Sequence, residues 1–390
     1  MKHLLIGLMA LSALICATQV VAQFQRLPSQ IVPYAPELSA RAWALLEVNS
    51  GWIVAGVNED QPFAPASITK LVTTYVAFDA LKIGLVSLDD AVEISEKAWR
   101  MRGSRMFAEV NTRIALERLL KSVIIQSGND AAVAIAEHLA GSELAFAAQM
   151  NRVAEQLGMR QAHFENASGW PAAGHQMSPR DILIIANALI TQFPQYYGWY
   201  SEKAFEHNGI LQTNRNKLLW KDKGVDGLKT GHTEAAGYCL VASAEREGER
   251  WIAVVMGTSS ESVRENEVTT LLEFGFNAFS VKELFVEQSG VAQAQVFGGE
   301  TDSVRLHAAE PVWVVVPRDR EDELLINLNI APDSIAPIKV GQALGVASVS
   351  LDGTALMDVP LVAMSEIPQG GLFKRAWDWI KRSTQGVLGL

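Results

Sequence analysis

Three stretches of the chain carry apolar residues at the spacing of a helix with one buried face. The third, residues 130–139, stops at Gly141, and glycine commonly ends helices. The first stretch has apolar residues at Ile68, Leu71, Val72, Tyr75 and Phe78. The second has them at Leu116, Leu119, Leu120, Val123 and Ile124. The pattern predicts three helices. It also predicts that Ser67, after Pro65 and Ala66, opens the first of them.

Four further stretches are rich in apolar and β-branched residues and favour strands: residues 42–48, 52–56, 237–244 and 251–257. Asn49-Ser50-Gly51 joins the first two and is a hairpin turn signal. The last two are apolar on both faces, as expected of central strands covered by helices on each side. Strands and helices together predict an α/β domain over residues 23–279 with a largely antiparallel sheet.

After residue 279 the pattern changes to short β-rich runs separated by Gly, Pro and Asp. The clearest runs are residues 303–307, 312–316, 346–349 and 361–364. This texture predicts a small all-β domain over residues 280–368, built as a sandwich.

The last segment, residues 369–390, has the pattern of an amphipathic helix. On a helical wheel one side carries Leu372, Phe373, Ala376, Trp377, Trp379 and Ile380, and the other Lys374, Arg375, Asp378, Lys381 and Arg382. Tryptophan, phenylalanine and cationic flanks are typical of a helix that lies in a lipid headgroup layer. The segment is too short and too charged to span a bilayer. The alternative is a helix docked on the protein's own core.

The first 22 residues have the pattern of a secretory signal peptide. Lys2 precedes an apolar run that extends to Ile15, and Ala22 ends the segment with a small side chain. The alternative is an uncleaved N-terminal anchor. Removal of the leader, with its Cys16, leaves Cys239 alone in an apolar run, so we expect a buried thiol and no internal disulfide.

Charge and composition exclude several classes of function. The chain has 33 basic and 43 acidic residues, and four of the basic ones lie in its last 20 residues. An acidic body with a basic tail disfavours nucleic acid as a partner and suits an anionic membrane surface. The seven histidines show no metal-ligand spacing and no phosphate-binding glycine loop occurs, so we expect neither a metal nor a cofactor.

Three short strings occur in a fixed order and supply the components of an acyl-transfer site. They are Ser67-Ile68-Thr69-Lys70, Ser127-Gly128-Asn129 and Lys229-Thr230-Gly231. Each alone is a weak signal because its residues are common. The ordered set, each member in a plausible structural setting, indicates a serine acyl-transfer enzyme.

The first string combines a nucleophile with a base. A helix places Lys70 one turn beyond Ser67 on the same face. A serine hydroxyl needs a base to remove its proton, and a lysine can be that base where burial and neighbouring cations lower its pKa. The alternative is that Ser67 only caps the helix and Lys70 is solvated.

The other two strings supply proton transfer and substrate binding. Ser127 can relay a proton to the leaving group, and Asn129 can hold a substrate amide or the lysine; the alternative is that Asn129 or Asp130 caps the next helix. On an edge strand, Lys229 and Thr230 can bind a substrate carboxylate, and Gly231 leaves room for the substrate backbone.

With these motifs, the chain resembles the low-molecular-mass penicillin-binding proteins, specifically the D-alanyl-D-alanine carboxypeptidases with a C-terminal β domain and a membrane tail. The neighbourhoods 123–130, 214–220, 225–232 and 370–373 are similar to that group's pattern. The resemblance implies a penicillin-interactive α/β fold, as in β-lactamases and transpeptidases, with an antiparallel sheet and a helical subdomain. It also implies removal of the terminal D-Ala from peptidoglycan pentapeptides, acylation by β-lactam antibiotics, and a periplasmic enzyme attached to the outer face of the inner membrane.

The resemblance also implies roles for individual residues. Ser67 would attack the D-Ala–D-Ala carbonyl with Lys70 as base, and the oxyanion would lie between the backbone N–H groups of Ser67 and His232. Proton transfer would be assisted by Ser127 and Lys229. The terminal carboxylate would be received by Thr230, Arg215 and Arg264. For either arginine alone, a surface salt bridge is the alternative. The segment 99–107 resembles the loop that borders this site in the family.

Three other functions remain open at this point: a β-lactamase, a DD-endopeptidase on the same scaffold, and a non-catalytic cell-wall scaffold. Glu165 falls near the place where a class A β-lactamase has its deacylating glutamate, but its surroundings do not match that motif. We therefore expect Glu165 to be a turn or surface residue.

Overall fold

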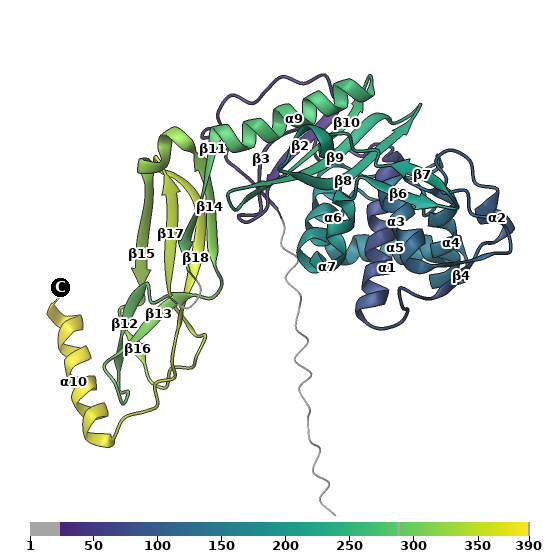
Figure 1. Ribbon diagram of the computed structural model, residues 1–390. Helices are drawn as coiled ribbons and strands as arrows, with labels where there is room; N and C mark the ends of the chain where they lie inside the picture. Colours follow the sequence, from purple (N-terminus) through teal and green to yellow (C-terminus); the bar gives the residue numbers. More distant parts are fainter. Residues whose placement is uncertain (1–23, 287–288, 389–390) are drawn as a thin grey trace, which may run out of the picture.

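The computed structural model describes residues 24–286 and 289–388, with side chains to residue 382. The leader predicted at residues 1–22 lies outside the described residues. The chain forms an elongated molecule in which an α/β part and a β part are joined end to end (Figure 1).

A six-stranded sheet forms the centre of the α/β part. Its strand order is β1-β3-β2-β10-β9-β8, and only the β1–β3 pair is parallel. The strands are β1 (Gln25–Arg26), β2 (Ala42–Glu47), β3 (Trp52–Val57), β8 (Val225–Thr233), β9 (Gly237–Arg246) and β10 (Glu249–Thr258). The predicted antiparallel sheet is therefore confirmed, and β8, which carries Lys229-Thr230-Gly231, is an edge strand.

Helices cover both faces of this sheet, as the apolar central strands predict. Along β10, Ile252 and Val254 pack with the helical part, while Trp251 and Ala253 pack on the opposite face, where α9 lies. The helices are α1 (Lys70–Lys82), α2 (Glu96–Trp99), α3 (Leu116–Ile125), α4 (Asn129–Ala140), α5 (Glu143–Leu157), α6 (Pro179–Gln192), α7 (Pro194–Tyr197), α8 (Leu218–Lys221) and α9 (Glu261–Ala278). Two small two-stranded sheets border the helical part: β4 (Ala91–Glu93) with β5 (Arg113–Ala115), and the hairpin of β6 (Ala204–His207) with β7 (Ile210–Thr213).

The start of α1 differs from the prediction. Ser67 lies in a 3-10 turn, η1 (Ala66–Thr69), and the α-helix begins only at Lys70. Neither element has a side-chain cap, so the alternative role of Ser67 as a helix cap is wrong. Gly169 packs so closely against this turn that a Cβ added to it would meet the Ala66 carbonyl oxygen at 1.8 Å, so only glycine fits there.

In the residues described, the second part of the molecule consists of strands apart from one short 3-10 turn and the C-terminal helix, so the predicted all-β domain is confirmed. β11 (Phe279–Phe285) and β14 (Val312–Pro317) form a two-stranded sheet. A second sheet has the order β15-β17-β18-β13-β12-β16. Its strands are β12 (Ala292–Phe297), β13 (Ser303–Ala308), β15 (Leu324–Ile330), β16 (Ser334–Ile335), β17 (Ala343–Leu351) and β18 (Thr354–Ala363). Apolar residues of both sheets belong to one core. The short η2 (Gly198–Ser201) and η3 (Arg318–Glu323) complete the chain's 3-10 elements in the described residues.

The C-terminal helix α10 (Leu372–Leu388) lies at the end of the β part, far from the α/β part (Figure 1). Leu372, Phe373 and Trp377 are 80%, 95% and 60% exposed, so the apolar side of the helix is not buried in the protein's core. Among the described residues, no single helix is long and apolar enough to cross a bilayer; only α4 and α5, bent by 84°, pass such a test as a pair.

The packing of α9 on the sheet gives a first prediction. Gly275 faces Trp251, and a Cβ added to Gly275 would meet the indole at 2.7 Å. We expect Gly275→Ala to push α9 away and to lower the free energy of unfolding by about 1–3 kcal/mol. Gly198→Ala is the matched control, because a Cβ there meets nothing within 4 Å. Denaturant unfolding measures both; equal stability of the two variants would contradict this account of the packing.

Candidate active site

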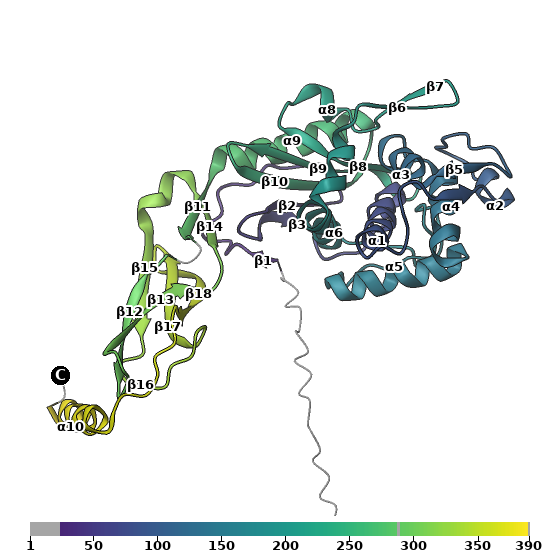
Figure 2. The same ribbon diagram turned by 60° about the horizontal axis from the view of Figure 1, so that its bottom comes forward.

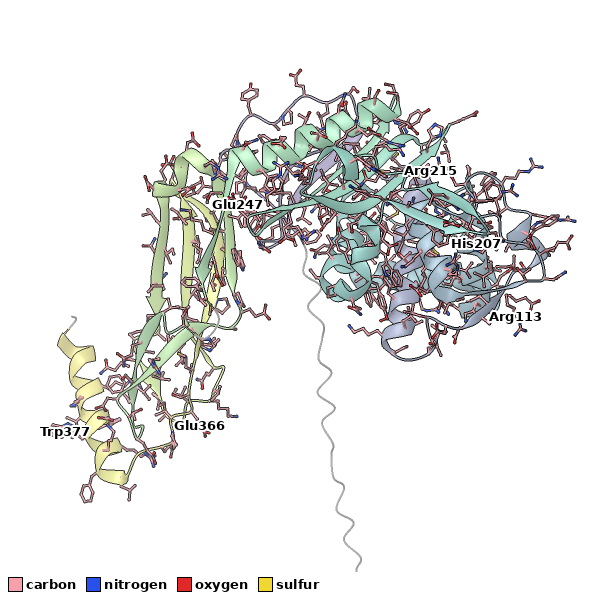
Figure 3. The ribbon with its side chains drawn as sticks, viewed as in Figure 1. Arg113, His207, Arg215, Glu247, Glu366 and Trp377 are labelled. Atoms are coloured by element: carbon pink, nitrogen blue, oxygen red, sulfur yellow. The ribbon has the colours of Figure 1, made fainter. Side chains whose placement is uncertain are left out.

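The three strings meet at one pocket of about 480 Å³ between the edge strand β8, the turn η1 and the start of α4. The part of the molecule that holds it includes Arg215, and it lies far from Trp377 of the tail (Figure 3). The lining residues are Ser67, Gly103, Ser104, Ser127, Asn129, Ser168, Gly169, Trp170, Pro171, Arg215, Thr230, Gly231, His232, Thr233, Glu261 and Arg264. Lys70 and Lys229 lie behind this lining and are 1% and 2% exposed.

Ser67 and Lys70 are in direct contact, as the first string predicts. The Lys70 ammonium donates to Ser67 Oγ (3.0 Å), to Asn129 Oδ1 (2.7 Å) and to the Ser168 carbonyl oxygen (2.5 Å). The alternative in which Lys70 is solvated is therefore wrong. Asn129 also donates to the Arg102 carbonyl (2.6 Å), so this amide holds the lysine and does not cap α4.

Burial lowers the pKa of Lys70 to about 7, because the charged form loses its hydration. The carboxylate of Asp130 acts in the opposite direction and raises this pKa. The balance leaves a substantial fraction of Lys70 unprotonated near neutral pH, and an unprotonated amine 3.0 Å from a hydroxyl is a competent base.

Ser127 and Lys229 form the second contact between strings. The Lys229 ammonium donates to Ser127 Oγ (3.0 Å) and to the Thr230 carbonyl (3.1 Å). Burial, together with the charges of Lys70, Arg215 and Arg264, lowers the pKa of Lys229 well below its usual value. Ser127 has φ 71°, a left-handed conformation that non-glycine residues rarely adopt. In this conformation the Ser127 hydroxyl lies 3.0 Å from the Lys229 ammonium.

Two cations and a hydroxyl line the pocket, as needed for an anionic group. Arg215, Arg264 and Thr230 all line it. Arg264 is 3% exposed, with Glu261 3.5 Å away and the Tyr238 ring below its guanidinium, and its Nε has no partner among the described residues. A buried arginine that lines a pocket is not a surface salt bridge, so that alternative is wrong for Arg264. Arg215 is exposed, and its backbone N–H donates to the Ile125 carbonyl (3.1 Å).

Gly231 is required for a reason that the sequence did not show. A Cβ added there would meet the Pro65 carbonyl oxygen at 2.7 Å, so glycine allows β8 to approach η1. The next residue, His232, lines the pocket beside Ser67, and its ring stacks on Tyr238 with centroids 4.0 Å apart. The close approach therefore brings the His232 backbone to the nucleophile's side of the pocket.

Sequence reasoning missed three contributors. The Ser168 carbonyl binds Lys70, and no motif marks a backbone acceptor. Trp170 lines the mouth and is 45% exposed. Asp130 accepts backbone N–H groups from Met106, Phe107 and Ala108 (3.0–3.2 Å) and so fixes the loop at residues 103–108. Its position beside Asn129 was the one available signal.

Glu165 and Cys239 take no part in the site. The Glu165 carboxylate contacts His163 Nε2 (3.0 Å), is partly exposed and does not line the pocket, as expected of a surface residue. Cys239 is buried, and burial raises the pKa of its thiol to about 11, which keeps it protonated and inert. In residues 24–286 and 289–388, no group of three or more His, Cys, Asp or Glu residues could hold a metal ion.

Two sequence families match the chain, one over the α/β part and one over the β part. The family described as D-alanyl-D-alanine carboxypeptidase matches residues 29–260, and the penicillin-binding protein 5 C-terminal domain matches residues 279–369.

Relatives match over most of the chain. The chain is 37% identical to the D-alanyl-D-alanine carboxypeptidase DacA of Haemophilus influenzae, over 90% of this chain and 91% of the relative. It is 38% identical to DacC of Escherichia coli, over 89% and 88% of the two chains. The solved structure of penicillin binding protein 5 from Haemophilus influenzae superposes with a TM-score of 0.83 at 36% identity, over 86% of this chain and 100% of the other.

A more distant structure shows a related protein with a bound drug. Penicillin-binding protein D2 of Listeria monocytogenes, in its ampicillin-bound form, is 29% identical with a TM-score of 0.58, over 63% of this chain and 100% of the other. The family matches, the relatives and the contacts between the three strings lead to one conclusion: the chain belongs to the D-alanyl-D-alanine carboxypeptidase family of penicillin-binding serine hydrolases.

Proposed function

We propose that this D-alanyl-D-alanine carboxypeptidase removes the terminal D-Ala of peptidoglycan pentapeptides through an acyl-enzyme on Ser67. The observation that carries the proposal is the 3.0 Å contact between Ser67 Oγ and a buried Lys70 whose pKa is about 7. An activated hydroxyl in a pocket that is lined by cations suits a peptide that ends in a carboxylate.

In the acylation step, unprotonated Lys70 takes the Ser67 proton as Oγ attacks the carbonyl carbon of the D-Ala–D-Ala bond. The carbonyl electrons move to oxygen, which the backbone N–H groups of Ser67 and His232 stabilise. When the tetrahedral species collapses, the C–N bond breaks and the amine of D-Ala receives a proton through Ser127, which Lys229 contacts. Water then attacks the ester and releases the shortened peptide.

The terminal carboxylate binds where Thr230, Arg215 and Arg264 line the pocket. Burial, and then the charges of Lys70, Arg215 and Arg264, lower the pKa of Lys229. An anion bound near these cations would offset their mutual repulsion. This electrostatic match favours substrates with a free C-terminal carboxylate, which is the defining feature of a carboxypeptidase substrate. It also suits β-lactams, whose carboxylate takes the same place while the ring opens on Ser67. Because Glu165 lies outside the pocket, no observation favours a β-lactamase.

The chain divides for this function into the leader at 1–22, the catalytic domain at 23–279, the β domain at 280–368 and the tail helix. We infer that the leader directs export and that α10 holds the enzyme on the outer face of the inner membrane. The inference is supported by the exposed apolar side of α10 and by its polar contacts with the β domain: Asp378 Oδ2 accepts from the Gly298 N–H (2.9 Å), and Lys374 bonds Asp302. The polar side binds protein and leaves the apolar side for lipid.

Labelling with a fluorescent penicillin tests the nucleophile. We expect a stable label on the wild type. In Ser67→Ala, both the labelling and the release of D-Ala should fall by at least about 1,000-fold, as is typical when a catalytic group is removed. Ser201→Ala, which changes an exposed serine, is the control and should label normally. Label that persists on Ser67→Ala would refute the assignment, and label lost from the wild type within seconds would indicate a β-lactamase.

The pH dependence of acylation tests the role of Lys70. Burial lowers its pKa to about 7, so the base form is lost as pH falls below that value. We expect the rate of penicillin acylation to be flat above about pH 7 and to fall about tenfold per pH unit below it. Lys70→Arg keeps a cation that stays protonated and should be inactive throughout. A wild-type acylation rate that does not change between about pH 5.5 and 8 would contradict Lys70 as the base, because an ordinary lysine has a pKa near about 10.4 and only a lowered pKa lets it titrate in this range.

Vesicle flotation tests the tail. A chain ending at Gly370 should stay in solution while the full chain without its leader floats with vesicles of anionic phospholipid. Phe373→Asp with Trp377→Asp should also abolish flotation, because it places charge on the exposed apolar side. Val340→Asp is the control: it changes a 65% exposed apolar residue of the β domain and should float normally. Flotation of the shortened chain would show that the anchor lies elsewhere.

A further inference from the structure

Strand β15 is an exposed apolar edge whose role the catalytic function does not explain. It is the terminal strand of the second sheet and pairs, within the described residues, only with β17. Leu325, Ile326 and Leu328 are 56%, 39% and 44% exposed. The strand lies on the side of the β part that is farther from the α/β part (Figures 1 and 2). Edge strands of soluble proteins usually carry charges, prolines or bulges that prevent pairing, and residues 324–330 contain no charge and no proline.

The register with β17 fixes which backbone groups remain available. Ala331 donates its N–H to the Leu344 carbonyl (2.8 Å), and Asp352 donates to the Glu323 carbonyl (3.5 Å). Hydrogen-bonded and non-hydrogen-bonded pairs alternate along an antiparallel ladder. The odd-numbered residues of β15 therefore face β17, and the even-numbered residues direct their N–H and C=O groups to the open edge.

We propose that β15 pairs antiparallel with β15 of a second copy of this chain, about a two-fold axis at Asn327. Two-fold pairing brings even-numbered residues opposite each other, as the hydrogen-bond pattern requires. Ile326 then faces Leu328 of the second copy, and Leu324 faces Ile330. All four side chains lie on one face of the strand. In this register, apolar side chains of one copy therefore lie opposite apolar side chains of the other.

Most of the charge beside the strand is offset within its own chain. The acidic residues next to β15 are Asp322 and Glu323 before it and Asp333 beyond it. Glu323 accepts from Arg320 (2.6 and 2.8 Å), and Asp333 pairs with Arg382 (3.4 Å). A two-fold interface is the commonest arrangement of homo-oligomers because one surface complements itself. Seven residues bury less than the roughly 1,600 Å² of a standard interface, so we expect a weak dimer that forms at high concentration.

Disulfide trapping tests the register in the full chain without its leader. At the axis, Asn327 faces Asn327 of the second copy as a non-hydrogen-bonded pair, with Cα atoms about 4.5 Å apart, a separation within reach of a disulfide. We expect Asn327→Cys to give a disulfide-linked dimer as its main product under mild oxidation. Leu325→Cys is the matched control: it lies on the same face of the same strand but faces Asn329, and should give only a trace. Native Cys239 is buried and adds no background.

A charge pair tests the same geometry without a covalent bond. Sedimentation velocity should show a concentration-dependent dimer for the wild type, and only monomer for Leu328→Lys or Ile326→Glu alone. Mixing these two variants should restore the dimer, because Lys at 328 of one chain faces Glu at 326 of the other. Val340→Lys should dimerise as the wild type does, and penicillin labelling should confirm that each variant is folded. A wild type that is monomeric at all concentrations, or equal cross-linking at positions 325 and 327, would overturn the proposal.

Discussion

The site depends on two lysine side chains that are kept from water while no carboxylate bonds to either, among the residues described. Lys70 and Lys229 are almost fully buried, and their bonding partners are hydroxyls, backbone carbonyls and one amide. Neutral acceptors satisfy an ammonium group but do not stabilise its charge as a carboxylate does. A bonded carboxylate would raise the pKa of Lys70 and remove the base. The architecture therefore has to gather neutral acceptors from distant segments, and this requirement explains why three separate strings converge.

Asp130 shows how closely this requirement is met. Its carboxylate is near enough to raise the pKa of Lys70, but its oxygens accept N–H groups of Met106, Phe107 and Ala108 and bond no lysine. The same group therefore orders the loop that borders the pocket and moderates the fall in the lysine pKa. Ser127, in its left-handed conformation, places its hydroxyl 3.0 Å from Lys229, and Gly231 allows β8 to lie close to the turn that carries Ser67.

Sequence was sufficient for the elements whose signal is local and periodic. Residues 130–139 lie within α4, which ends at Ala140 before Gly141 with φ 73°, and the apolar runs at 237–244 and 251–257 lie within β9 and β10. The pairing of Ser67 with Lys70 also follows from local spacing. The 3-10 turn at Ser67 was not predicted, because apolar spacing does not distinguish a 3-10 turn from the first turn of an α-helix. The Ser168 carbonyl was equally hidden, since any residue type can supply a backbone acceptor.

The orientation of the C-terminal helix α10 is a further feature that the sequence could not predict. A helical wheel separates the two sides of α10 but does not say which side meets the protein. Contacts answer that question: Asp378 is 4% exposed and bonds the Gly298 N–H, while Phe373 on the other side is 95% exposed. A helix docked by its polar side moves with the β domain instead of trailing from it. In the membrane arrangement proposed above, the β domain would transmit the orientation of α10 to the catalytic part and would hold the pocket at a set position relative to the bilayer. A flexible tether with the same apolar residues would give the same membrane affinity without that constraint.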